Sequence, residues 1–232
     1  MGIFSHPYKA LVLGASGAIG NAFLKAFELD PMCVHAKGIC RSQQPWFDLE
    51  NSDKFSDIAS QLQSDGPFHI IIDATGALNI HGVGPEKSLT ALRQESLARS
   101  FQINAIGPVM LLRYLAPLLV AGPGIYAKLS ARVGSISDNK LGGWYGYRAS
   151  KAALNMLLQT AAIELQRKNS ALRVIALQPG TVRSTLSKPF SAAVENLLEP
   201  HESVAGMLSA IKNAQPKQGA HFLDHKGQII DW

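Results

Sequence analysis

A tyrosine and a lysine four residues apart are the first candidates for chemistry in this sequence. Tyr147 and Lys151 lie in the segment GWYGYRASKAALN at residues 143–155, and a helix would place both side chains on one face, one turn apart. A positive charge beside a phenol favours the phenolate and lowers the pKa of the tyrosine, which suits general acid or base catalysis near neutral pH. An ordinary surface pair on a helix has the same spacing, so the rest of the chain must support the assignment.

A glycine-rich segment near the start of the chain is the second candidate. Residues 8–13 are a largely apolar run that predicts a strand, the sequence GASGAIG follows at residues 14–20, and residues 21–29 have helical spacing. A strand, a glycine turn and a helix favour phosphate binding, because glycines permit close approach of the backbone and the helix offers unpaired N–H groups. The alternative is a tight turn that uses glycine for its backbone freedom alone.

The predicted second strand, residues 32–40, ends at Arg41 and Ser42. In a dinucleotide-binding fold this tip meets the adenosine ribose, where an acid binds the 2′-hydroxyl of NAD and an arginine accommodates the 2′-phosphate of NADP. The tip carries no acid, so the sequence favours NADP over NAD, with a merely solvated arginine as the alternative. Asp48 and Leu49 come next, where adenine contacts are expected, although Asp48 equally suits the start of a helix.

Strand and helix patterns alternate along the remainder of the chain. Strands are expected at residues 68–73, 124–130, 172–178 and 219–223, and a long helix at residues 89–119. That helix contains Asn104 and a Gly-Pro pair at 107–108, and these residue types are unfavourable inside a helix. Such a mismatch between residue type and local structure often marks a functional site. The alternative is that Asn104 is an ordinary polar helix residue. We predict an α/β fold: one domain over residues 1–232, a Rossmann-type doubly wound parallel sheet of about seven strands with helices on both faces.

The helix that carries Tyr147 is expected to continue to Lys168. Its residues 149–163 are apolar almost all round, which one sheet face does not explain. We therefore expect a homodimer or homotetramer in which this helix packs against its copy.

Composition restricts the possible partners. The chain has 232 residues, 47% of them hydrophobic, and its net charge of +5 is dispersed without a run of like charges. This balance suits an anionic small ligand, and we expect neither a nucleic-acid nor a membrane partner. Cys33 and Cys40 are expected to be buried reduced thiols, without a metal site, in a soluble cytoplasmic protein.

In their order and spacing, these motifs resemble the short-chain dehydrogenase/reductase superfamily, and within it the C-factor and sniffer-type carbonyl reductase branch. The resemblance rests on the glycine loop, on Asn104 before Gly107-Pro108, on Tyr147-Arg-Ala-Ser-Lys151, on Pro179-Gly180 and on the closing segment 222–232. It implies that Tyr147 protonates a carbonyl oxygen while a nicotinamide delivers hydride, that Lys151 lowers the pKa of Tyr147 and holds the nicotinamide ribose, and that Asn104 anchors a water for proton resupply.

The resemblance and the patterns above together predict the cofactor-binding residues. They are Gly14, Ser16, Gly17, Ala18, Ile19, Gly20, Arg41, Ser42, Asp48, Leu49, Ala74, Thr75, Gly76, Asn104, Tyr147, Lys151, Pro179, Gly180, Thr181 and Val182.

Three positions depart from the family pattern. Ala18 replaces the middle glycine of the loop, and Asp73-Ala74-Thr75-Gly76 stands where the family has Asn-Asn-Ala-Gly. Ala131 occupies the place of the catalytic serine; Ser130 is expected to point to the opposite face of its strand, and Ser135 lies four residues further on the loop, from where it could swing in.

The leading hypothesis is an NADP-dependent oxidoreductase that acts on a carbonyl or alcohol of a small molecule. Losing one hydrogen-bond donor at a developing oxyanion costs about 10² to 10³ in rate. The alternative is therefore a cofactor-binding signalling or regulatory protein of the C-factor type, with little turnover.

Overall fold

The computed structural model describes residues 3–44, 47–80, 82–184 and 197–232. In this part of the chain, six parallel strands form one sheet in the order β2-β1-β3-β4-β5-β6. The strands are β1 (Tyr8–Leu13), β2 (Cys33–Ile39), β3 (Ile70–Asp73), β4 (Ile125–Leu129), β5 (Arg173–Gln178) and β6 (His221–Asp224). The predicted doubly wound parallel sheet is confirmed, with six strands described where about seven were predicted.

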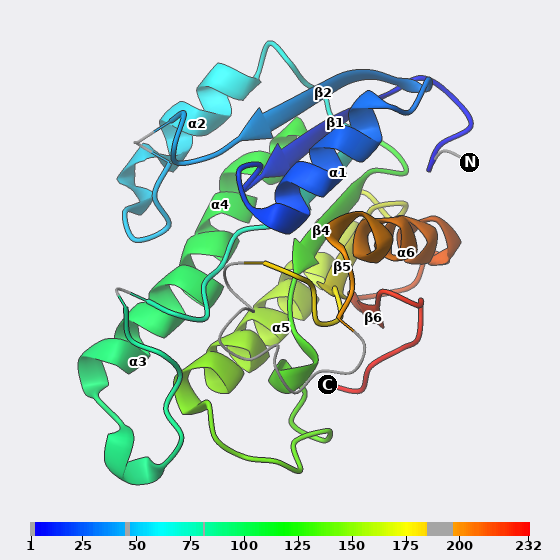
Figure 1. The fold of residues 1–232 in the computed structure, drawn as a ribbon. Coiled ribbons are helices and arrows are strands. Elements are labelled where there is room, and N and C mark those ends of the chain that lie inside the picture. The colour runs from blue at the N-terminus through cyan, green and yellow to red at the C-terminus, as the bar shows by residue number, and fades with distance from the viewer. Residues whose placement is uncertain (1–2, 45–46, 81, 185–196) are drawn as a thin grey trace.

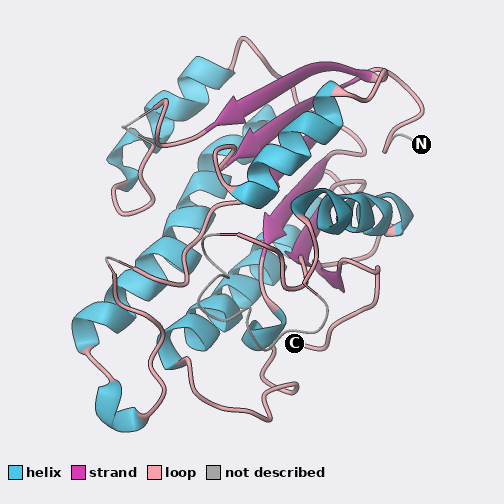
Figure 2. Cartoon of the chain, in the orientation of Figure 1, coloured by secondary structure: helices cyan, strands magenta, loops and turns pink. Residues whose placement is uncertain are grey.

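Helices cover both faces of the sheet (Figures 1 and 2). One layer consists of α1 (Ala18–Glu28) and α6 (Pro200–Asn213), and the opposite layer of α2 (Phe55–Leu62), α4 (Gly107–Leu115) and α5 (Tyr145–Gln166). Each layer closes its own apolar core against the sheet. Because both faces are covered, the central strands are apolar without alternation, as the three fully buried isoleucines of β3 illustrate.

The long helix predicted at residues 89–119 is wrong as one regular element. The chain instead forms a 3₁₀ turn (Leu89–Ala91), α3 (Gln94–Phe101), a π-helical turn (Gln102–Ile106), α4 and a second 3₁₀ turn (Ala116–Leu118). The Gly107 N–H donates to the Gln102 carbonyl, five residues back, directly before a proline that has no N–H to donate. The irregularity that the sequence predicted around Asn104 is therefore a π-helical turn within the helix.

Helix α5 begins at Tyr145 and ends at Gln166, two residues before the predicted end. It buries Leu154, Leu158 and Ala162 against the sheet, while the Met156 side chain is 66% exposed. Whether a second copy covers that side stays a prediction.

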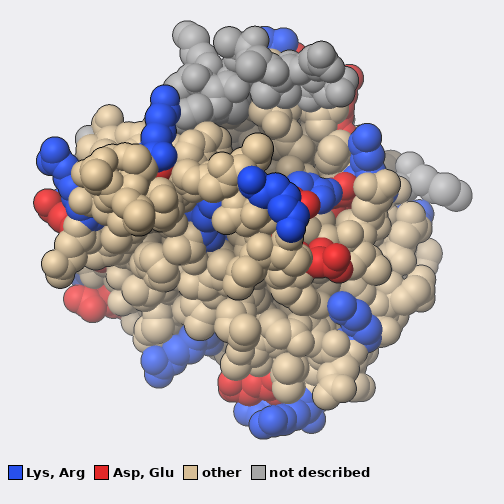
Figure 3. All heavy atoms as spheres, turned by 90° about the horizontal axis from the view of Figure 1, so that it is seen from below, with Lys and Arg blue, Asp and Glu red and all other residues tan. Residues whose placement is uncertain are grey.

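The remaining composition-based expectations concern cysteines, membranes and charge. Both cysteines are free thiols; Cys40 is buried and Cys33 only partly so. Among the helices of the described residues, none combines the length and apolar character that a membrane crossing needs. On the face in Figure 3, basic and acidic side chains are interspersed among uncharged ones.

One ion pair lies inside the sheet itself. Asp73, at the end of β3, is the register partner of Lys128 on β4, and the Lys128 Nζ lies 3.0 Å from the Asp73 Oδ1, with both side chains 0% exposed. The Tyr126 hydroxyl donates to the other oxygen, Asp73 Oδ2, at 3.1 Å. The burial that makes the strands apolar therefore obliges these two charges to remain paired.

Removing one partner of this pair is expected to be costly. We expect Lys128→Met to lower the free energy of unfolding by about 3–5 kcal/mol, because it leaves a buried carboxylate without its counter-ion. The double variant Asp73→Asn/Lys128→Met should recover most of that loss, since it leaves no isolated charge. Urea unfolding of the three proteins measures both effects, and a double variant less stable than the single one would contradict the assignment.

Candidate active site

The strand order indicates a ligand site at the carboxyl ends of the strands. From β1 the chain proceeds outward to β2 on one side and returns to β3 on the other, and ligands bind at the carboxyl ends of strands where the order reverses in this way. A groove of about 270 Å³ lies there. It is lined by nine of the predicted cofactor residues, namely Gly14, Ser16, Gly17, Arg41, Asp48, Leu49, Ala74, Thr75 and Gly76.

The glycine loop is shaped for close packing of backbone on backbone. Gly14 has φ +77°, and a Cβ there would lie 3.1 Å from the carbonyl carbon of Ala74. A Cβ on Gly20 would lie 2.8 Å from the carbonyl carbon of Gly14, so no side chain fits at that position. Helix α1 begins at Ala18 without a side-chain cap on Gly17, which leaves the first N–H groups of the helix available to an anion.

The residues after β2 lie beside this loop. Arg41 is exposed and borders the groove, and the Ser42 Oγ lies 3.2 Å from the Cys40 Sγ. Asp48 accepts the Glu50 N–H at 3.0 Å and thus stabilises a turn, while Asn51 caps the short 3₁₀ turn (Ser52–Lys54) that precedes α2. Asp48 therefore belongs to the wall of the groove and not to a helix start.

Asn104, in the π-helical turn, binds the backbone of Ala77 beside the groove. Its side chain is fully buried, and its amide both accepts from the Ala77 N–H and donates to the Ala77 carbonyl, each at 2.9 Å. Next to it, Gly76 has φ +134°, and a Cβ there would lie 3.1 Å from the Asn104 Oδ1 and 3.4 Å from the Lys151 Nζ. Asn104 and Lys151 thus meet at Gly76; the water-anchoring role of Asn104 stays a prediction.

Tyr147 and Lys151 stand on the first two turns of α5, as predicted. The Lys151 Nζ donates to the Leu129 carbonyl at 3.1 Å and lies 5.7 Å from the centroid of the Tyr147 ring. Burial raises the pKa of Tyr147 to about 12. Burial, and after it the positive charge of Lys128, lowers the pKa of Lys151 to about 7, against the opposing effect of Asp73.

The net pKa shift of Tyr147 is upward, opposite to the predicted direction, while the effect of Lys151 alone on this pKa stays a prediction. Removal of the phenolate from water outweighs any attraction to the lysine. The same desolvation acts on Lys151, whose charged form is itself disfavoured. The phenol is therefore a proton donor throughout the neutral range, and the amine is the group of the pair that titrates near neutrality.

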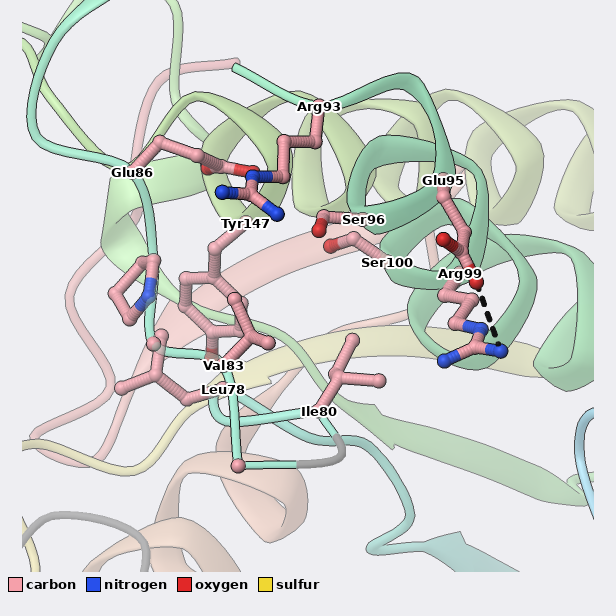
Figure 4. A pocket seen from close by; sticks show the side chains of 13 residues that line it. Leu78, Ile80, Val83, Glu86, Arg93, Glu95, Ser96, Arg99, Ser100 and Tyr147 are labelled. Carbon is pink, nitrogen blue, oxygen red and sulfur yellow. Dashed lines mark ion pairs between the residues drawn. The ribbon is translucent and has the colours of Figure 1, made fainter. Parts of the chain in front are cut away.

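A cavity of about 480 Å³ opens beside Tyr147 (Figure 4). Leu78, Ile80 and Val83 form an apolar side. Opposite them lie Arg93, which directly precedes α3, and the α3 residues Ser96 and Ser100. The cavity is large enough for a small organic substrate.

Glu86, which the sequence analysis did not single out, also borders this cavity. Its carboxylate accepts the Gly146 N–H at 2.9 Å, so it holds the first turn of α5 from a loop about 60 residues upstream. No spacing or motif in the sequence connects the two segments.

The two serines near Ala131 have other partners. Ser130 is buried and donates to the Asn155 Oδ1 at 2.6 Å. The Ser135 Oγ lies 3.2 Å from the Ser137 Oγ and accepts the Asp138 N–H at 3.2 Å. Both hydroxyls are thus held by neighbours other than Tyr147, and their catalytic roles stay predictions.

Pro179, Gly180, Thr181 and Val182 follow β5 at the same edge of the sheet. Gly180 has φ +78°, Ser203 of α6 donates to the Pro179 carbonyl at 2.6 Å, and Val182 bridges to Leu198. This turn is therefore fixed against α6 and the segment at Leu198.

The fold, with a groove where its strand order reverses, is of the dinucleotide-binding class, and comparisons with known proteins give its family. The family model described as short chain dehydrogenase matches residues 44–195. A Rhodococcus 1-hydroxy-2-glutathionyl-2-methyl-3-butene dehydrogenase is 28% identical over 92% of this chain and 89% of its own length. The C-signal protein of Myxococcus xanthus is 30% identical over 72% of this chain and 94% of its own.

Solved structures share the fold over nearly the whole chain. A short-chain dehydrogenase/reductase from Burkholderia multivorans with bound NADP has a TM-score of 0.81 at 24% identity, covering 98% of this chain and all of its own. The carbonyl reductase Sniffer of Drosophila melanogaster has a TM-score of 0.83 at 22% identity with the same coverage. The chain belongs to the short chain dehydrogenase family, which uses nicotinamide cofactors.

Proposed function

We propose that the protein is an NADP-dependent oxidoreductase that reduces a carbonyl, or oxidises an alcohol, on a small molecule. One arrangement carries this proposal: Asn104 and Lys151 meet at Gly76, and Lys151 lies 5.7 Å from the ring of Tyr147, which borders the 480 Å³ cavity. Membership of the family supports the reaction class.

The residues fit a nicotinamide dinucleotide. The backbone of the loop at Gly14 and Gly20 leaves no room for side chains, and the first turn of α1 presents free N–H groups. The groove extends to Gly76, where a Cβ would lie 3.4 Å from the Lys151 Nζ. When bound, the cofactor supplies or accepts a hydride.

The chain's own residues would then manage the proton. In the reducing direction, the Tyr147 hydroxyl donates its proton to the carbonyl oxygen of the substrate. The Lys151 ammonium stabilises the phenolate that this transfer leaves. Asn104, anchored on both sides of the Ala77 peptide, keeps the adjoining turn in place.

A preference for NADP over NAD is part of the proposal. Arg41 borders the groove where the adenosine ribose is expected, and a guanidinium binds a phosphate monoester with charge-assisted hydrogen bonds. The Burkholderia structure that shares the fold contains NADP.

Ala131 favours a second candidate function, a cofactor-binding signalling or regulatory protein with little turnover, of the kind the name C-signal suggests for the Myxococcus relative. Measuring NADPH consumption against a panel of aldehydes, ketones and diketones separates the two. Binding of NADPH without turnover on any of them would support this second candidate.

Replacing the proposed acid tests the mechanism. We expect Tyr147→Phe to abolish turnover of a confirmed substrate while NADPH affinity changes less than about threefold, because the phenol donates the proton and its ring remains. Tyr145→Phe is the matched control, since it removes a hydroxyl two residues away on the same helix. Steady-state kinetics and NADPH fluorescence titration measure the two properties; full activity in Tyr147→Phe refutes the role.

Replacing the proposed phosphate ligand tests the cofactor preference. We expect Arg41→Ala to weaken NADPH binding by about 10- to 100-fold through loss of charge-assisted hydrogen bonds, with NADH binding nearly unchanged. Arg167→Ala, which removes an exposed arginine at the end of α5, controls for net charge. Equal losses for both cofactors would show that Arg41 does not read the 2′-phosphate.

We also infer that copies of this protein associate through α5. The exposed Met156 side chain on that helix supports the inference. Light scattering at micromolar concentration should give a dimer or tetramer, and Met156→Glu should shift it toward the monomer. A monomeric unsubstituted protein would contradict the inference.

A further inference from the structure

A polar cluster at the ends of β3 and β4 adjoins the proposed site through Thr75, which also lines the groove. It consists of Asp73, Thr75, Tyr126 and Lys128, and neither Lys128 nor Tyr126 belongs to any motif of the sequence. Asp73 and Thr75 stand in the segment where the family pattern has asparagines, so the cluster is a feature of this chain that the family resemblance does not explain.

The cluster fixes the turn from Asp73 to Gly76 from its inner side. The Lys128 Nζ donates to the Thr75 carbonyl at 2.6 Å and lies 3.1 Å from the Thr75 Oγ1. The Asp73 Oδ1 accepts both the Thr75 N–H at 2.9 Å and the Thr75 hydroxyl at 2.5 Å. Ammonium and carboxylate together thus satisfy every polar group of Thr75.

Lys151 approaches the same turn from its other side. The Lys151 Nζ lies 3.4 Å from where a Cβ of Gly76 would be, and it donates to the carbonyl of Leu129, the residue after Lys128. Two ammonium groups therefore flank the single peptide that joins Thr75 to Gly76.

We propose that Lys128 is a positioning residue of the active site, which holds the Asp73–Gly76 turn against Asn104 and places its positive charge across that turn from Lys151. The proposal rests on the proposed function in one respect, the assignment of Lys151 as the partner of Tyr147.

The charges around Lys151 support this role. Lys128 from β4, Asp73 from β3 and Tyr147 from α5 itself are the titratable groups that face it within the described residues. Of the charges, Lys128 lowers the pKa of Lys151 more than Asp73 raises it. Without the Lys128 charge, Lys151 should hold its proton to higher pH.

Direct titration of the lysine ammonium groups by NMR of protein with ¹³C- and ¹⁵N-labelled lysine tests the proposal without cofactor or substrate. Lys151→Met and Lys128→Met assign the two resonances. We expect Lys151 to titrate near pH 7 in the unsubstituted protein, and in Lys128→Met its pKa should rise by about one unit or more. Tyr126→Phe is the matched control: it removes a hydrogen bond of the same cluster without changing its charge, so the pKa of Lys151 should stay within about 0.3 units.

The double variant Asp73→Asn/Lys128→Met covers the case in which the single variant does not fold. It should also raise the pKa of Lys151, by less than the single variant, because it removes the opposing Asp73 charge as well. A Lys151 pKa that is unchanged or lower in either folded variant overturns the proposal. So does an unsubstituted protein in which Lys128 loses its proton before Lys151, a measurement that requires no variant to fold.

The two proposals fail separately. If no carbonyl compound is turned over, the titration still decides whether Lys128 controls Lys151. If turnover depends on Tyr147 but the Lys151 titration ignores Lys128, the proposed function stands and the role of Lys128 is refuted.

Discussion

The pairing of Asp73 with Lys128 is the interaction on which the rest of the site depends. Both side chains are fully buried between neighbouring strands, where an unpaired charge is strongly unfavourable. The two charged groups also hydrogen-bond the N–H and the carbonyl of Thr75. These bonds fix the turn that ends at Gly76. Asn104 and Lys151 then pack against this turn at distances that a single Cβ would disturb. The need to pair two buried charges thus also determines the position of the turn beside the candidate active site.

The parallel sheet explains why such distant segments can share one site. All six described strands deliver their carboxyl ends to one edge, so the glycine loop, the Asp73 turn and the turn at Pro179 are neighbours without being close in sequence. The π-helical turn (Gln102–Ile106) adds Asn104 from a helix that would otherwise pass by. The glycine loop and Asn104 thus lie in irregular segments next to regular elements, whereas Tyr147 and Lys151 stand on the regular helix α5.

Local patterns in the sequence predicted most of this arrangement and missed the interactions between segments. Runs of β-branched residues located β3, and the glycines located the turn between β1 and α1, because each signal is contained in a few consecutive residues. The conflict at Asn104 was visible for the same reason, although the form it takes was not. Lys128 and Glu86 were missed because their partners lie 55 and 60 residues away, and the direction of the Tyr147 pKa was wrong because burial is a property of the fold.

The charge on Lys151 matters more because Ala131 carries no hydroxyl to donate a hydrogen bond. With the two nearby serine hydroxyls held by Asn155, Ser137 and Asp138, the substrate oxygen would lack the donor that the family places beside the tyrosine. Such a donor contributes about 2.7–4 kcal/mol to stabilising a developing oxyanion. Under the proposed mechanism, proton donation by Tyr147 would then carry more of the stabilisation. A phenol whose pKa is about 12 would yield its proton readily only with a cation next to the phenolate. Because the pKa of the buried Lys151 lies near 7, the presence of that cation depends on pH and on the charges around the lysine.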